Sequence, residues 1–105
     1  MSLYGDGYNN SYALGYGHIP QVGMTVYAVS PKTPGVIAEI IGPDTKQGAD
    51  YHGQPYHFKV RVRWLNSEHA SVRSTYGLHD MDARIADLTR QLEEMTRLRD
   101  ALIAQ

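Results

Sequence analysis

The chain of 105 residues contains no cysteine, and this absence removes several options at once. Disulfide bridges, thiolate metal sites and a cysteine nucleophile are all excluded. A domain of this length also lies near the lower limit at which a single hydrophobic core is sufficient for stability. Stability must therefore come from packing of the core or from association with other molecules.

The sequence also lacks long apolar runs and a strong excess of one charge. No stretch approaches the roughly 18 consecutive apolar residues of a membrane-spanning helix, and Met1 is not followed by the basic and apolar segments of a signal peptide. We therefore expect no membrane partner and no secretion by a signal peptide. The net charge of −1 is far from the strongly basic balance of a dedicated nucleic-acid-binding protein.

The N-terminal segment, residues 1–18, has a regular pattern. Tyrosine recurs at every fourth position, while the odd positions from 5 to 17 carry only Gly, Asn, Ser or Ala. In an extended chain the tyrosines would share one face and leave the other nearly bare, and four glycines make a helix unfavourable. We predict an extended arm that docks on a neighbouring subunit, with a low-complexity tail as the alternative. The docking residues would be Tyr4, Tyr8, Tyr12, Leu14 and Tyr16.

Residues 19–79 have the pattern of a small β domain. Strands are expected over residues 24–29, 36–41, 58–64 and 70–76, with turns between them and a long polar loop over residues 44–55. The third strand is the clearest, because Phe58, Val60, Val62 and Trp64 alternate with Lys59, Arg61 and Arg63. This alternation predicts a half-buried strand with a basic outer face. Val72 is the expected core residue of the fourth strand.

Residues 80–105 predict an amphipathic helix that begins near Met81 and is capped by Asp80 or Asp82. A heptad register places Ile85, Leu92 and Arg99 at position a and Leu88, Met95 and Leu102 at position d. Leu98 and Ile103 widen the apolar stripe beyond what a two-stranded zipper needs, which favours a bundle or docking on another surface. The expected contact residues are Ile85, Leu88, Leu92, Met95 and Leu102.

The helix has two alternative roles, an oligomerisation seam or a lid on its own β domain. Arg99 at a core position favours the lid or a contact with a different protein. Its charge would be costly in a dry seam between identical helices.

Several segments resemble small SH3-like barrels of the KOW and Tudor type. The resemblance rests on the sequences VGMTVY (22–27), PGVIAEI (34–40) and VRVRW (60–64) and on a closing Gly77 and Leu78, and it covers roughly residues 20 to 79. It implies an SH3-like small barrel for this segment. Together with the extended N-terminal arm and the C-terminal helix, the expected fold is mainly β with a C-terminal α-helix. Barrels of this type bind nucleic acids, read methyl-lysine or mediate protein interactions, so the fold alone selects no function.

An arm, a barrel and a terminal helix together resemble the accessory proteins of virus and phage particles, whose arms tie neighbours together. We therefore expect a non-enzymatic structural protein, such as a head decoration, cement or connector protein of a phage. It would reside in the virion or in the cytoplasm of the host cell. Its partners would be other protein subunits of the assembly, including copies of itself, and no cofactor is expected.

The alternative function is a KOW- or Tudor-like nucleic-acid-binding module. Lys59, Arg61 and Arg63 project from one strand face, and Arg73 of the next strand could join them to contact phosphates. A solvated outer face is the favoured explanation of the same residues. Four cations are also few beside the phosphate contacts of specific binders.

Catalytic and metal sites find little support in the sequence. Asp50, His52 and His57 share the long loop and are residue types that bind metals, but loop histidines are more often simply solvated. His69 with Ser71 and His79 with Asp80 lack the nucleophile elbow of a hydrolase. We therefore predict no catalytic residue and no metal site.

Overall fold

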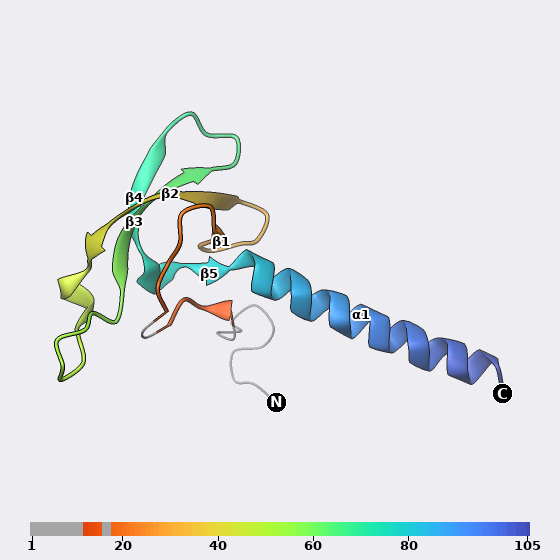
Figure 1. Cartoon of the computed structure of the whole chain (residues 1–105). Helices are drawn as coiled ribbons and strands as arrows, with labels where there is room; N and C mark the ends of the chain where they lie inside the picture. The colour runs from red at the N-terminus through yellow and green to blue at the C-terminus, as the bar shows by residue number, and fades with distance from the viewer. Residues whose placement is uncertain (1–11, 16–17) are drawn as a thin grey trace.

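The computed structural model describes residues 12–15 and 18–105, which form one antiparallel sheet followed by a long helix (Figure 1). The strands are β1 (Thr25–Tyr27), β2 (Pro34–Pro43), β3 (Phe58–Trp64), β4 (Ala70–Ser74) and β5 (His79–Asp80). The helical segments are the 3₁₀ turns η3 (Thr45–Gln47) and η4 (Thr75–Gly77) and the α-helix α1 (Met81–Ile103). The predicted fold class, mainly β with a C-terminal α-helix, is confirmed.

The sheet has the strand order β4-β3-β2-β1-β5. The first four strands form a meander, and β5 returns to pair with β1, opposite Val26 and Tyr27. Two register shifts in β2, between Ile37 and Glu39 and between Ile40 and Gly42, interrupt its pairing with β3. Such irregularities bend a strand and increase its twist.

The inner face of the sheet carries the hydrophobic core. The predicted alternation along β3 is confirmed. Val60 and Val62 are fully buried, whereas Lys59, Arg61 and Arg63 are exposed. We call the basic side of β3 the outer face. The core consists of Leu14, Val26, Ile37, Val60, Val62 and Leu78.

Leu14 in this core corrects the prediction that it docks on a neighbour. It is 2% exposed, and its backbone N–H donates to the carbonyl of Leu78 at 2.9 Å. Ala13 forms a β-bridge with His79, so the segment lies along the free edge of β5. Tyr12 is also buried, whereas Tyr4, Tyr8 and Tyr16 lie outside the described residues.

The prediction for Val72 is wrong. Val72 lies opposite Arg61 in the β3–β4 register and is 49% exposed on the outer face. Its neighbour Ser71 lies opposite Val62 instead, and the Ser71 hydroxyl accepts a hydrogen bond from the indole N–H of Trp64 at 2.7 Å. The inner side of β4 is therefore polar, and no apolar alternation marks its register.

The polar loop that follows β2 is held by local hydrogen bonds. The Asp50 carboxylate accepts from the backbone N–H groups of His52 and Gln54, both at 2.9 Å, and Ala49 bridges to Pro55. Asp44 is buried and accepts from the backbone of Lys46. These contacts explain how a glycine-containing polar segment becomes an ordered connection between β2 and β3.

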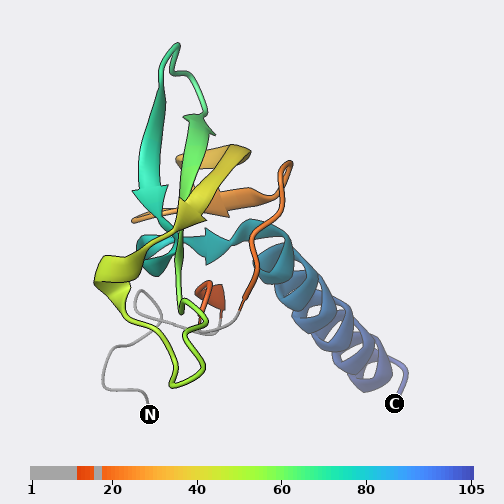
Figure 2. The same cartoon turned by 60° about the vertical axis from the view of Figure 1, so that its left-hand side comes forward.

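Helix α1 leaves the sheet directly after β5 and extends away from it (Figures 1 and 2). None of its residues is buried. The radius of gyration is 17.1 Å, whereas a compact chain of this length is expected to have about 13 Å. The possibility that α1 is a lid on its own sheet is therefore contradicted.

Gly35 is required where β2 crosses between β1 and β3. A Cβ atom at this position would lie 2.5 Å from Cγ1 of Val62 and 2.8 Å from Cε3 of Trp64. We predict that Gly35→Ala lowers the free energy of unfolding by about 1–3 kcal/mol, because the core must move to accept the methyl group. Urea denaturation followed by Trp64 fluorescence measures the effect.

Gly77→Ala is the matched control for Gly35→Ala. A Cβ at Gly77 would meet no atom within 4 Å, so this change should alter stability by less than about 0.5 kcal/mol. A Gly35→Ala protein as stable as the Gly77→Ala protein would contradict the close packing described for β2.

Candidate functional site

The start of α1 is fixed by a polar and aromatic junction with the sheet. Asp80 caps the helix, since its carboxylate accepts from the backbone N–H of Ala83 at 3.0 Å. One turn later Arg84 donates to the hydroxyl of the buried Tyr27 at 2.9 Å. The Arg84 guanidinium also lies 5.5 Å from the ring centroid of Tyr27, within the range of a cation–π contact.

Tyr12 completes this junction from the N-terminal segment. Its hydroxyl donates to the Asp87 carboxylate, and its ring centroid lies 5.7 Å from the Arg84 guanidinium. The hydrogen bond from Tyr12, followed by that from Arg90, lowers the pKa of Asp87. The same bond and partial burial raise the pKa of Tyr12. Tyr12 therefore anchors the chain's own helix, where the sequence predicted a contact with a neighbour.

The sequence analysis missed this junction as a unit. Tyr12 and Asp87 are 75 positions apart, and Tyr27 and Arg84 are 57 positions apart. Contacts between residues so far apart in the sequence cannot be predicted from local residue spacing. The only sequence signal was the Asp80 cap, which was predicted as one of two possibilities and is the one that the structure shows.

The apolar stripe of α1 has no covering surface among the described residues. We define the stripe as seven side chains whose exposed fractions run from 49% to 73%. They are Ile85, Leu88, Leu92, Met95, Leu98, Leu102 and Ile103. All five predicted helix contact residues belong to it. The junction with the sheet uses Arg84 and Asp87 instead, and the seven side chains of the stripe stay exposed.

The polar side of α1 is held by short-range ion pairs. Arg90 contacts Asp87 at 2.7 Å, and Arg99 contacts Asp100 at 3.0 Å. Exposed pairs of this kind contribute at most about 1 kcal/mol each. They keep the helix soluble without covering its apolar side.

The basic residues do not form the continuous stripe that was considered for nucleic-acid binding. Arg61 donates to Glu39 of β2 at 2.9 Å, which neutralises its charge locally. Arg73 lies opposite Val60 in the register and therefore on the inner side, where its guanidinium lies 5.4 Å from the ring centroid of Trp64. Within the described ranges, Lys59 and Arg63 remain on the outer face without an ion-pair partner.

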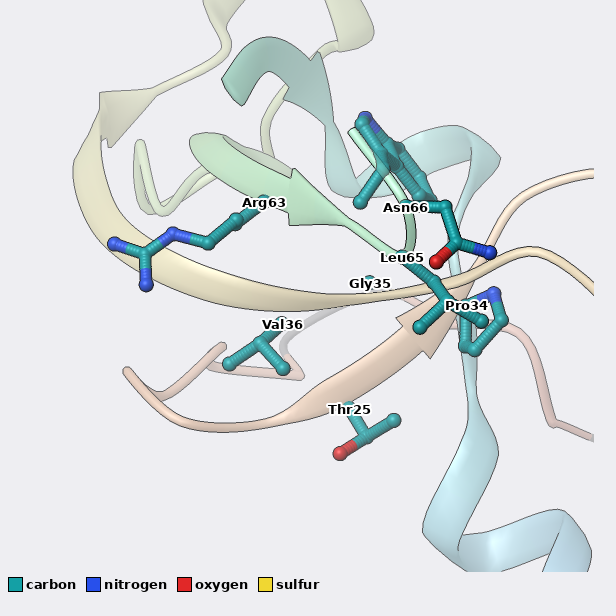
Figure 3. Close-up of a pocket in the computed structure, with 8 residues that line it drawn as sticks. Thr25, Pro34, Gly35, Val36, Arg63, Leu65 and Asn66 are labelled. Carbon is teal, nitrogen blue, oxygen red and sulfur yellow. The ribbon is translucent and has the colours of Figure 1, made fainter. Parts of the chain in front are cut away.

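A shallow groove of about 320 Å³ adjoins Arg63 at the end of β3. Thr25, Val36 and Arg63 lie along one part of it, and Pro34, Leu65 and Asn66 lie at the other (Figure 3). Its lining is mostly apolar, so it suits an aliphatic side chain better than a phosphate or a polar substrate.

The loop histidines do not come together as a metal site. His57 is buried, and its Nδ1 atom lies 3.0 Å from the hydroxyl of Thr75, whereas His52 is exposed and packs against Tyr51. Over residues 12–15 and 18–105, no three His, Asp or Glu side chains are placed to hold a metal ion. The same part of the chain contains no helix of the length and apolar character needed to cross a membrane.

Searches of protein-family models, curated proteins and solved structures find no significant match to this chain.

Two histidines have lowered pKa values in the folded protein, so its stability depends on pH. Burial lowers the pKa of His57, and burial together with the nearby Arg84 charge lowers the pKa of His79. His79 stacks on Tyr27 at 5.0 Å, and its buried Nδ1 atom has no hydrogen-bond partner among the described residues. Both imidazoles therefore stay neutral in the folded state under conditions in which an exposed histidine is protonated.

We predict that the free energy of unfolding falls as the pH drops below about 6.5, the ordinary pKa of histidine. In that range the unfolded chain binds more protons than the folded chain, so acid favours unfolding, while above it these histidines contribute no pH dependence. His79→Phe keeps an aromatic ring beside Tyr27 and should flatten the profile measured by urea denaturation between pH 5 and pH 8. His69→Gln, which removes an exposed imidazole, is the control. A wild-type profile that rises on acidification would contradict this assignment.

Proposed function

We propose that this chain is a non-enzymatic structural protein that assembles with neighbouring protein subunits through α1. The observation that carries the proposal is the apolar stripe of α1, whose side chains are 49–73% exposed. The helix that bears the stripe projects from the sheet (Figure 1). A helix in a globular protein normally buries such a stripe against a second surface. Contiguous exposed apolar patches mark sites of protein interaction.

The free energies expected from burial favour the stripe of α1 over the other surfaces as the main contact with a partner. Burying one Leu, Ile or Met side chain fully contributes about 1.5–3 kcal/mol relative to leaving it in water. An exposed ion pair such as Arg61 with Glu39 contributes at most about 1 kcal/mol. Seven partly exposed apolar side chains on one helix therefore outweigh the polar contacts that the outer face of the sheet offers.

The N-terminal arm offers fewer residues for contact with neighbouring subunits than the sequence predicted. Tyr12 and Leu14 serve the protein's own junction and core. Docking by Tyr4, Tyr8 and Tyr16 stays a prediction, because these residues lie outside the described ranges.

A more specific form of the proposal is a phage particle component, such as a head decoration, cement or connector protein. This form rests on the resemblance in architecture of an arm, a β domain and a terminal helix. The protein would then reside in the virion or in the host cytoplasm, and the sheet domain would act as a rigid block carried by the helix.

Nucleic-acid binding is the alternative, and it rests on Lys59 and Arg63 of the outer face. We place it second because Arg61 is paired with Glu39 and Arg73 lies on the other side of the sheet. Binding of RNA or DNA that weakens with added salt and with Arg63→Gln would favour this alternative over assembly.

We predict that Leu92→Asp abolishes assembly. A carboxylate in the middle of a buried seam must lose its hydration, so the dissociation constant should rise by at least about 100-fold. The molar mass of the purified chain, measured by sedimentation equilibrium over a range of concentrations, reports the change.

Ala86→Asp is the matched control, because it introduces the same carboxylate at an exposed position of α1 outside the stripe. It should leave the molar mass of the wild type unchanged. If the wild type and both variants have the same molar mass at every concentration, assembly through α1 is wrong.

A further inference from the structure

We propose that the partner of α1 is a second copy of this chain, and that the two helices pair in antiparallel orientation over residues 85–102. The inference rests on the proposed assembly function and adds the identity of the partner and its direction. It follows from the order of residues along the stripe, from the position of Arg99 and from the location of the sheet at one end of the helix.

The stripe is complementary to itself when one helix is reversed. In antiparallel coiled coils a residue at position a packs against a residue at position d of the other helix. Aligning Leu92 with Met95 of the second copy also aligns Ile85 with Leu102 of the second copy and Leu88 with Arg99 of the second copy. One register therefore matches all six a and d positions between Ile85 and Leu102, and no position is left over.

Arg99 decides between the two orientations, because it is the only charged residue among these six positions. In a parallel pair the two Arg99 side chains would share one layer, with helix axes about 8–10 Å apart. In the antiparallel pair they lie in layers 11 residues apart, which corresponds to about 16 Å along the axis. That distance exceeds the Debye length of about 8 Å at physiological ionic strength, so their repulsion is largely screened.

The conformation of Arg99 also suits this arrangement. Its guanidinium donates to the Asp100 carboxylate through Nε at 3.2 Å and through Nη2 at 3.0 Å. Asp100 occupies position b, outside the a and d seam. The charged group is therefore already paired beside the seam, and the apolar stem of Arg99 can cover Leu88 of the second copy. The antiparallel geometry therefore does not require the charge of Arg99 to be buried in a seam between identical helices.

The residues flanking the seam do not oppose the reversed pairing. Thr89, Gln91 and Thr96, which occupy flanking e and g positions, are uncharged. The flanking Arg84 is held in the junction by Tyr27. No cluster of like charges is brought together at the rim of the seam.

The position of the sheet favours the same orientation. The sheet and the junction surround only the first turns of α1, and the C-terminal end carries no other part of the described chain (Figure 2). A parallel pair brings two sheets to the same end, beside Ile85 and Leu88. An antiparallel pair places each sheet beside the free end of the other helix. The dimer would then be a symmetric rod, about 35 Å long for 23 residues, with one sheet domain at each end.

Disulfide cross-linking tests this orientation cleanly, because the natural chain contains no cysteine. Leu88→Cys and Arg99→Cys are made as two separate single variants. Each is incubated alone and in an equimolar mixture in a glutathione redox buffer, and the products are identified by intact mass. Cysteines whose Cα atoms are more than about 7 Å apart cannot be bridged without moving the backbone.

The antiparallel pair predicts that the mixture forms the mixed disulfide and that each variant alone forms at least about tenfold less dimer, since like cysteines then lie far beyond bridging distance. Ile85→Cys with Leu102→Cys is a second pair with the same expectation. Ala86→Cys with Ala101→Cys is the matched control outside the stripe, and neither the mixture nor the single variants should cross-link.

Other outcomes overturn the orientation or the assembly, and they can be told apart. Efficient disulfide formation by Leu88→Cys alone and by Arg99→Cys alone would show a parallel pair. No cross-link in any mixture, with a wild-type molar mass of a dimer or larger, would overturn this register while leaving assembly intact. No cross-link together with a monomeric wild-type chain would overturn both this inference and assembly through α1.

Discussion

The junction between β5 and α1 is the constraint on which the rest of this structure depends. Arg84 and Asp87 turn one side of the helix toward the buried Tyr27 and toward Tyr12. This contact is polar and lies within the first two turns. The apolar residues of α1 stay between 49% and 73% exposed, and no other part of the described chain buries them. A chain of 105 residues without disulfides has few apolar residues available for its own core. Seven apolar side chains nevertheless lie outside that core, and our proposal explains them as part of a second core shared between subunits.

Much of the fold could be predicted from local patterns. The alternation along β3 identified its buried and exposed sides, and the spacing of Ile85, Leu88 and Leu92 identified α1 and its stripe. Patterns of this kind are reliable because one face of each element is apolar over several turns or residue pairs. The residue type limited the helix cap to Asp80 or Asp82, and the structure shows that it is Asp80.

The errors arose where long-range pairing decides the side on which a residue lies. Val72 and Arg73 exchanged sides relative to the prediction, because β4 pairs with β3 in a register that its own polar sequence does not reveal. Leu14 was assigned to a neighbour because its segment looks like a separate arm, and only its pairing beside β5 shows that it belongs to the core. Whether α1 covers its own sheet depends on the direction in which the junction points the helix. The apolar periodicity of residues 80–105 predicts a helix, but it does not predict how that helix is oriented relative to the sheet.

Hydrogen exchange as a function of protein concentration tests the central claim, that α1 is completed by another subunit. Most of the stability of a helix in a protein comes from the packing of its apolar face, so the amides of α1 exchange quickly unless a partner covers the stripe. The account predicts that amides of residues 88–102 become protected as concentration rises, while those of β3 are protected throughout. Amides of α1 that exchange at the same rate at every concentration, while β3 stays protected, would contradict it.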